Sequence, residues 1–206
     1  MTVIAVDGPA ASGKGTIARA LALHYGLPHL DTGLLYRAVG VTVARAGLDP
    51  DNEANATEAC DFPDALLGEP ELRSEEAGAL ASRVSIHPAV RTALLERQRA
   101  FAAQPGGAVL DGRDIGTVIA PEADAKLFVT ASVDARAARR HIEDPARTLE
   151  SLREDLAARD ARDTNRSNAP LRQADGADLL DTSNLTIGAA IQSAIALVDA
   201  RLEGRR

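Results

Sequence analysis

The sequence predicts a three-layer α/β fold in which a parallel β-sheet is covered by helices on both faces. Short apolar runs alternate with longer segments of helical hydrophobic periodicity along the 206 residues, and this alternation is typical of parallel sheets. Hydrophobic residues make up 45% of the chain, which is enough for a substantial core. We therefore expect one compact domain.

Five apolar runs are the candidate strands. The clearest is Val3-Ile4-Ala5-Val6, because it is continuously apolar and ends in Asp7-Gly8, as a buried strand does before a turn. The other predicted strands span residues 27–30, 108–110, 126–130 and 179–180.

The predicted helices lie between these strands. Glycines at positions 26 and 47 end the first two periodic segments, at residues 16–25 and 34–46. Residues 48–71 are acidic and poorly patterned, so we expect a loop with a short helix near residues 53–60 and a turn at 68–70. The remaining helices are expected at residues 75–84, 89–103, 133–141, 149–163 and 187–202.

The composition excludes several classes of function. A net charge of −7 and a pI near 5.1 argue against a surface that binds long polyanions, and 2% aromatic residues leave few rings for stacking on single strands. We expect no nucleic-acid partner. The single cysteine, Cys60, suits a reducing cytoplasm, and no segment is long and apolar enough for a signal or a membrane span. We therefore expect a cytoplasmic protein without a membrane partner.

A phosphate-binding loop follows the first predicted strand. Gly8 and Gly13 enclose four residues, Lys14 follows, and a predicted helix begins, which is the context of a P-loop. Glycines let backbone N–H groups turn toward phosphate oxygens, and Lys14, one of only two lysines, adds a point charge. Gly15 stands where the strict motif has Ser or Thr. This variant points away from GTPases and toward kinases of small molecules.

Arginines and carboxylates form three further clusters. Asp111-Gly112-Arg113-Asp114 follows a predicted strand, at the sheet edge where α/β proteins bind ligands. The spacing of Arg159, Asp163 and Arg166 places them on one helix face, and three arginines of the preceding helix share a face too. Taken singly, such clusters are usually solvated charged faces. Beside a P-loop, they supply the positive charge that phosphoryl transfer needs. The arginines of the preceding helix are Arg136, Arg139 and Arg140.

Several segments together resemble bacterial cytidylate kinases, a branch of the nucleoside monophosphate kinases. The resemblance covers most of the chain, and its most specific segments are LDGRDIGT and RDARDTNRSNAPL. The matching stretches are residues 4–16, 30–37, 88–101, 110–117 and 159–171, with LLDTSNLTI near the C-terminus.

The resemblance implies a P-loop kinase fold with a five-stranded parallel sheet, a nucleotide-monophosphate-binding insert at about residues 34–87 and a lid at about 141–158. The core would be residues 1–33, 88–140 and 160–206, all within a single domain. It also implies transfer of a phosphoryl group from ATP to CMP and dCMP with Mg²⁺. Proteins of this kind are often monomers.

The resemblance assigns roles at matching positions. The ATP phosphates would be held by Gly8, Pro9, Ala10, Ala11, Ser12, Gly13, Lys14, Gly15 and Thr16, and the hydroxyl of Thr16 would reach Mg²⁺ mostly through water. The acceptor would be bound by Thr32, Tyr36, Arg37, Ser82, Arg91, Arg113, Asp114, Arg159, Asp163 and Arg166. Among these, Lys14, Arg113 and Arg166 would act in transfer, helped by a lid arginine from Arg136, Arg139 or Arg140. The four histidines match no catalytic position, and we interpret them as structural or surface residues.

Two features depart from the family pattern. The segment from Asp49 to Arg73 is shorter than usual and has little strand pattern, and the lid is short, with Asp144-Pro145 at its tip. Kinases of the same fold that act on UMP, dTMP, AMP or shikimate therefore remain as alternatives. A nucleotide-dependent switch is a weaker one, because the chain lacks a lysine-containing guanine-recognition segment.

Overall fold

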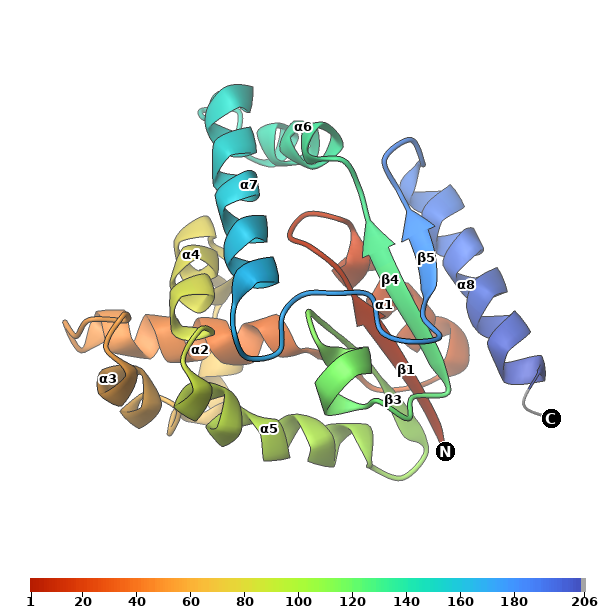
Figure 1. The fold of residues 1–206 in the computed structure, drawn as a ribbon, viewed down its shortest axis with the longest axis horizontal. Coiled ribbons are helices and arrows are strands. Elements are labelled where there is room, and N and C mark those ends of the chain that lie inside the picture. The colour runs from red at the N-terminus through yellow and green to blue at the C-terminus, as the bar shows by residue number, and fades with distance from the viewer. Residues whose placement is uncertain (205–206) are drawn as a thin grey trace. The chain divides into compact units, whose positions relative to one another are not determined.

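The computed structural model describes residues 1–204 and divides into two compact units. One comprises Met1–Leu30 and Phe101–Arg206 and is called the core unit here. The other, Asp31–Ala100, is called the inserted unit. The ribbon in Figure 1 traces both units from the N-terminus in red to the C-terminus in blue.

A five-stranded sheet with the order β2-β3-β1-β4-β5 confirms the predicted α/β class. The pairs β1–β3, β1–β4 and β4–β5 are parallel. All five predicted strands exist, although the second begins at His29 rather than at Leu27, two residues later than expected. The strands are β1 (Thr2–Asp7), β2 (His29–Asp31), β3 (Gly107–Gly112), β4 (Ala125–Thr130) and β5 (Asp178–Asp181).

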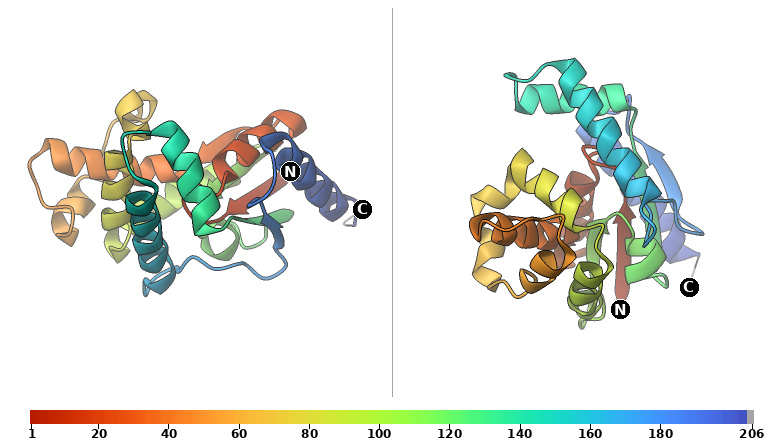
Figure 2. Two further views of the ribbon diagram at one scale, coloured as in Figure 1. Left: turned by 90° about the horizontal axis from the view of Figure 1, so that it is seen from above. Right: turned by 60° about the vertical axis from the view of Figure 1, so that its left-hand side comes forward.

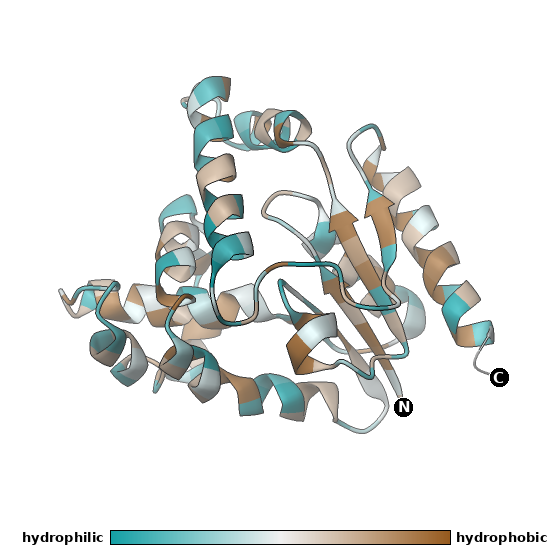
Figure 3. Cartoon of the chain, viewed as in Figure 1, coloured by the Kyte–Doolittle hydropathy of each residue, from teal (hydrophilic) through white to brown (hydrophobic). Residues whose placement is uncertain are grey.

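One face of the sheet packs against α1 (Lys14–Tyr25) and α8 (Ile187–Glu203). Alternate residues of the strands point to this face because side chains in a strand alternate between its two sides. Figure 3 shows the strands as the most hydrophobic part of the chain. The buried cluster consists of strand residues Ile4, Val6, Val109, Leu127, Val129 and Leu180 with helix residues that include Ile17, Leu21, Ala194 and Val198.

Asp7 and Lys126 lie on the opposite face of the sheet, because each is adjacent in its strand to a core residue, Val6 or Leu127. A π-helical segment, Ile115–Ile119, covers this face, together with the chain between residues 166 and 177, which crosses in front of the strands in Figure 1. Gly116 of this segment lies so close to Ala174 that an added Cβ would be 3.2 Å from the Ala174 Cβ. The π-helical segment is not apparent in the sequence pattern.

Two helices, α6 (Val133–Glu143) and α7 (Leu149–Asn165), lie side by side in both views of Figure 2. Leu152 and Leu156 of α7 pack with Ala137 of α6 and with Ala10 of the loop after β1. The prediction that Arg166 shares the helix face of Arg159 and Asp163 is wrong. The helix ends at Asn165, and Arg166 is extended with ψ 139°, because the polar run that follows leads to Pro170 and does not continue a helix.

The inserted unit is helical. Residues 32–100, all of which the structure describes, contain no strand, in agreement with the weak strand pattern of this segment. Asp31 caps the first helix by accepting a hydrogen bond from the Gly33 N–H at 2.9 Å. The helices are α2 (Thr32–Arg45), α3 (Glu53–Glu58), α4 (Glu75–Val84) and α5 (Pro88–Ala102), with 3₁₀ turns at Asp64–Gly68 and Pro70–Arg73.

None of the helices within residues 1–204 combines the length and the apolar character that a membrane span needs.

Asp7 joins the end of β1 to the π-helical segment. Its carboxylate accepts hydrogen bonds from the backbone N–H groups of Ile115 and Gly116, each at 2.8 Å. Burial raises the pKa of Asp7 to about 7, although these two hydrogen bonds oppose the shift. The carboxyl group therefore fixes the chain directly after Arg113 and Asp114.

We predict a pH-dependent contribution of Asp7 to stability. Its pKa is about 7 in the folded chain against a reference of 3.8, so between these values the folded protein binds a proton that the unfolded chain has lost. The free energy of unfolding should therefore fall as pH rises through this window, by up to about 1.4 kcal/mol per pH unit from this group. Asp7→Asn should lack that component. Urea unfolding of wild type, Asp7→Asn and the exposed-site control Asp61→Asn checks this, and parallel curves for all three would contradict it.

Candidate functional site

The loop between β1 and α1 presents a helix N-terminus without a side-chain cap. Gly13 precedes α1 with φ 88°, and no side chain of the described residues hydrogen-bonds to cap this helix end. The first N–H groups of a helix point along its axis and carry partial positive charge, so an uncapped N-terminus attracts anions. Lys14, the first residue of α1, adds its ammonium group at the same end.

The path of the loop is tightly constrained. Gly8 has φ 155°, and an added Cβ would be 2.0 Å from the carbonyl oxygen of Val129 on β4, so only glycine fits. Ala11 has φ 59°, a left-handed conformation that is strained for a non-glycine residue. Ser12 is fully buried, and its Oγ has no hydrogen-bond partner among the described residues. Strain and an orphaned polar atom are typical of a ligand-binding loop.

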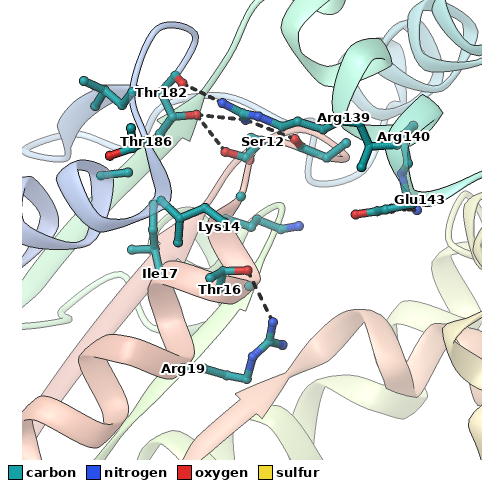
Figure 4. Close-up of a pocket in the computed structure, with 17 residues that line it drawn as sticks. Ser12, Lys14, Thr16, Ile17, Arg19, Arg139, Arg140, Glu143, Thr182 and Thr186 are labelled. Atoms are coloured by element: carbon teal, nitrogen blue, oxygen red, sulfur yellow. Dashed lines mark hydrogen bonds and ion pairs between the residues drawn. The ribbon is translucent and has the colours of Figure 1, made fainter. Parts of the chain in front are cut away.

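A pocket of about 440 Å³ opens over this loop. Figure 4 shows Lys14 of α1 and Arg140 of α6 beside it. The wall away from the loop is formed by the chain after β5 and includes the apolar side chains of Leu185 and Ile187. Thr182, Thr186 and Glu143, also labelled in Figure 4, belong to the polar part of the lining. The pocket thus combines an end whose charges and N–H groups suit a phosphate with an apolar wall that suits a planar base.

The three arginines of α6 have different surroundings. Arg136 is buried, pairs with both carboxylate oxygens of Asp160 at 3.1 and 2.6 Å, and donates to the Ala10 carbonyl at 3.3 Å. Arg139 donates to the Ala11 carbonyl at 3.4 Å and to the Thr182 carbonyl at 2.6 Å. Both therefore hold the outer side of the loop.

Arg140 lies at the pocket. Its guanidinium forms an ion pair with Glu143, one turn along the same helix, at 3.1 Å.

The first carboxylate of the predicted cluster at residues 111–114, to which the sequence analysis assigned no role, lies beside the loop. Asp111, at the end of β3, is 1% exposed, and its Oδ2 is 4.0 Å from Nζ of Lys14. The Nε2 of His29 lies 2.7 Å from the other oxygen of Asp111. The register Val6↔Asp111 brings the ends of β3 and β1 to the same sheet edge. The rule that pointed to Arg113 and Asp114, that ligands bind after parallel strands, also identifies Asp111.

Arg113 and Asp163 form a buried ion pair. The Nε of Arg113 donates to Asp163 Oδ2 at 2.7 Å. Burial acts to raise the pKa of Asp163, but the charges of Arg113, Arg159 and Arg166 outweigh it and hold that pKa below its usual value. Burial likewise acts to lower the pKa of Arg113, and the Asp163 carboxylate raises it. Both groups remain charged at neutral pH, so the structure keeps a cation fixed at this sheet edge.

Arg166 and Asp114 form a second, looser pair in the core unit. Their charged groups are 3.7 Å apart and both side chains are almost fully buried. The Nε of Arg166 donates to the Ala169 carbonyl at 2.5 Å. The structure therefore brings together four residues that were predicted to bind the acceptor. They are Arg113, Asp163, Arg166 and Asp114.

The predicted site residues of the inserted unit include a second cluster. The guanidinium carbon of Arg91 is 5.7 Å from the ring centroid of Tyr36, within the range of a cation–π contact. Thr32, Ser82 and Arg91 are all buried. Arg37 donates to the carbonyls of Leu72 and Ser74 at 2.7 and 2.8 Å, so it also holds the 3₁₀ turn at Pro70–Arg73.

Sequence reasoning missed Thr182, Leu185 and Ile187 of the pocket. Thr182 directly follows β5, so the rule on strand ends would have identified it. Leu185 and Ile187 carry no such signal, because exposed apolar residues near a helix start are common in sequences that bind nothing.

Comparison with known proteins gives the family. Residues 4–200 match the family model described as cytidylate kinase. A protein from Xanthobacter autotrophicus with the name cytidylate kinase is 57% identical over 207 residues, covering 98% of this chain and 100% of the relative. Another of that name, from a Methylobacterium strain, is 56% identical and covers 98% of this chain and 99% of the relative.

Solved structures agree on the fold alone. An uncharacterized protein from Eubacterium ventriosum has a TM-score of 0.58 at 14% identity, with coverage of 97% of this chain and 99% of that one. A gluconokinase from Sinorhizobium meliloti has a TM-score of 0.52 at 17% identity, with coverage of 99% and 95%. The P-loop before α1 and the paired charges of the LDGRDIGT segment agree with the sequence matches, which extend over nearly the whole chain. These matches show that the chain belongs to the cytidylate kinase family.

Proposed function

We propose that this protein transfers the γ-phosphoryl group of ATP to CMP and dCMP, giving ADP and the corresponding diphosphates. The observation that carries the proposal is the uncapped N-terminus of α1 with Lys14 beside it, at one end of a pocket with an apolar wall. Family membership supports the nature of the acceptor.

ATP would occupy this pocket. Its phosphates would accept hydrogen bonds from the backbone N–H groups between Gly8 and Thr16, and the ammonium of Lys14 would contact the β- and γ-phosphates. The adenine would lie against Leu185 and Ile187, the apolar part of the lining. Arg140, which lines the pocket, would approach the phosphates from α6.

The acceptor phosphate would be held by Arg113, whose planar guanidinium can donate two parallel hydrogen bonds to a phosphate. Asp163 accepts a hydrogen bond from Nε of Arg113 and thereby orients the outer edge of the guanidinium. Arg159 and Asp163 are proposed to contact the sugar, and Arg166 to approach the transferring group. Thr32, Tyr36 and Arg37 of the inserted unit are proposed to contribute to binding of the monophosphate, on the basis of the family pattern.

Base recognition is proposed for Ser82, Arg91 and Asp114. Cytosine offers an amino donor and two acceptors, so a carboxylate suits the amino group, and a guanidinium and a hydroxyl suit the acceptors. Uracil reverses two of these polarities and would leave buried groups unpaired. Discrimination of this kind can be large.

Transfer would require positioning and charge neutralisation. An oxygen of the CMP phosphate attacks the γ-phosphorus in line, the bond to the β-phosphate oxygen breaks, and ADP leaves. The attacking oxygen is already anionic, so no general base is needed. Lys14, Arg113 and Arg166 would stabilise the negative charge that spreads over the transferring group.

The oxygen-bearing side chains fit a hydrated Mg²⁺. Thr16 supplies a hydroxyl and Asp111 a carboxylate beside the loop, and Mg²⁺ in such sites is held through few protein ligands, waters and substrate phosphates. Residues 1–204 contain no cluster of three or more acidic, His or Cys side chains that would form a complete metal cage. When bound with ATP, Mg²⁺ neutralises phosphate charge. We further infer a cytoplasmic monomer that binds no nucleic acid.

A panel of acceptors tests the proposed function. With ATP and Mg²⁺, release of ADP should be fast with CMP and dCMP and slow with UMP, dTMP, AMP, GMP and shikimate, because only cytosine matches the hydrogen-bonding polarity proposed for Ser82, Arg91 and Asp114. A coupled spectrophotometric assay measures this. Preference for another acceptor would overturn the choice of substrate, and tight ATP binding without turnover on any acceptor would overturn the kinase assignment for the isolated chain.

Lys14→Arg should reduce kcat by at least about a hundredfold, because a planar guanidinium does not replace a compact ammonium in a tight loop. The chain offers a matched control in its other lysine. Lys126 donates to the Asp175 carbonyl away from the pocket, and Lys126→Arg should leave kcat near that of wild type. Steady-state kinetics of both variants tests this. Near-normal turnover of Lys14→Arg would contradict the proposed contact between Lys14 and the phosphates.

Asp114→Asn separates two roles of a buried carboxylate. If Asp114 accepts from the cytosine amino group, the ratio of kcat/KM for CMP over UMP should fall at least about tenfold, because an amide can both donate and accept. If Asp114 acts only by holding Arg166, both acceptors should lose the same factor. Kinetics with each nucleotide, together with calorimetric ATP binding, distinguishes these outcomes.

A further inference from the structure

We propose that His29 is a positioning residue for phosphoryl transfer, acting through Asp111 on Lys14. This inference rests on the proposed function and adds to it a residue that the family pattern does not single out. It follows from a chain of three side chains that runs from the start of β2, through the end of β3, to the start of α1.

The first link is the hydrogen bond between His29 and Asp111. The imidazole Nε2 and the carboxylate Oδ1 are 2.7 Å apart. A carboxylate can only accept, so Nε2 carries the hydrogen in this pair. The side chains are 16% and 2% exposed, respectively. A charge-assisted hydrogen bond in such a protected place has a well-defined geometry.

The second link runs from Asp111 to the phosphate-binding loop. Its other oxygen, Oδ2, lies 4.0 Å from Nζ of Lys14, too far for a hydrogen bond but close enough for a strong charge interaction. The same oxygen would be 3.6 Å from a Cβ added to Gly15. Asp111 therefore faces the loop directly, with one oxygen toward His29 and one toward the lysine.

The hydrogen bond fixes the rotation of the carboxylate. A carboxylate that is free to turn would approach the ammonium and form a tight pair, which would draw the lysine away from the phosphates. With Oδ1 bound to His29, Asp111 stays at a distance that orients Lys14 without withdrawing it. An incoming phosphate also repels this carboxylate, and the donor on His29 offsets part of that repulsion.

The reading of His29 as a purely structural residue makes a different prediction. A structural hydrogen bond at the edge of the sheet would contribute to the free energy of unfolding, but its loss would leave the turnover of the remaining folded enzyme intact. The positioning role requires a loss of turnover that exceeds any loss of folded protein.

The first experiment compares His29→Leu, His29→Gln, and the control His24→Leu. His24 is exposed and contacts the Tyr25 ring away from the pocket. We expect His29→Leu to lower kcat about tenfold, with a small change in KM for CMP, since it removes a charge-assisted hydrogen bond that acts on the transferring end of the site. His29→Gln retains an N–H donor and should recover most of the loss.

Thermal melts of each variant accompany the kinetics. Wild-type kcat in His29→Leu, with or without a lower Tm, would overturn the proposal. A loss in His29→Gln as large as that in His29→Leu would also overturn it, because rescue by a retained donor is what separates positioning from packing.

A double-mutant cycle with Asp111→Ala provides a readout besides activity. The dissociation constant of ATP is measured by calorimetry for wild type, both single variants and the double variant. If His29 acts through Asp111, His29→Leu should weaken ATP binding in the wild-type background and have no further effect once Asp111 is replaced. Additive effects, or no effect of His29→Leu on ATP binding, would overturn the proposal. Because this cycle measures ATP binding alone, it remains decisive even if CMP proves not to be the acceptor.

Discussion

A loop that turns its N–H groups toward an anion must turn its carbonyl groups the other way, and the core unit is built around that constraint. The carbonyls of Ala10, Ala11 and Ser12 point out of the loop after β1, and each accepts a hydrogen bond. Buried carbonyls without partners would be costly, so the donors are part of the site. The donors are Arg136, Arg139 and Thr182, in that order.

These three donors come from two separate parts of the chain. Arg136 and Arg139 belong to α6, while Thr182 follows β5. The backbone N–H of Thr182 donates to the Thr130 carbonyl, and the Thr182 hydroxyl accepts from Arg139, so the end of β5, the end of β4 and α6 meet behind the loop. The need of the loop carbonyls for hydrogen-bond donors thereby fixes the positions of three elements.

The charges of the core unit follow the same logic. The chain is acidic overall, yet arginines gather at the carboxyl edge of the sheet, and buried ones have carboxylate partners. A buried cation is tolerated only when paired. Asp160 and Asp163 pair with Arg136 and Arg113, one turn apart on α7. That helix therefore contributes structural carboxylates as well as the proposed ligand of the sugar.

Much of the fold was predictable because local signals agreed with it. Glycine stops and apolar periodicity located the helices, and the continuous apolar run located β1. The π-helical segment Ile115–Ile119 was not predictable, since it depends on hydrogen bonds to Asp7 from a distant strand. Arg166 was misplaced because its helical spacing to Asp163 continued past the real end of α7. The contact between His29 and Asp111 was missed for a related reason, because sequence separation hides contacts that only strand register creates.

The anchoring of α6 has a mechanical consequence for the hairpin that it forms with α7. Arg136 and Arg139 of α6 donate to carbonyls of the loop after β1, and Arg136 also pairs with Asp160 of α7. The turn at residues 144–148 is held instead by its own bonds, between His141 and the Arg147 carbonyl and between Arg147 and Ser151. The hairpin is therefore fixed where α6 contacts the loop after β1, while the turn at residues 144–148 is held by bonds within the hairpin itself. Changes in the length of this turn, or a fluorescent label attached to it, would leave the loop after β1 undisturbed. The turn is therefore the natural place to insert, delete or label residues.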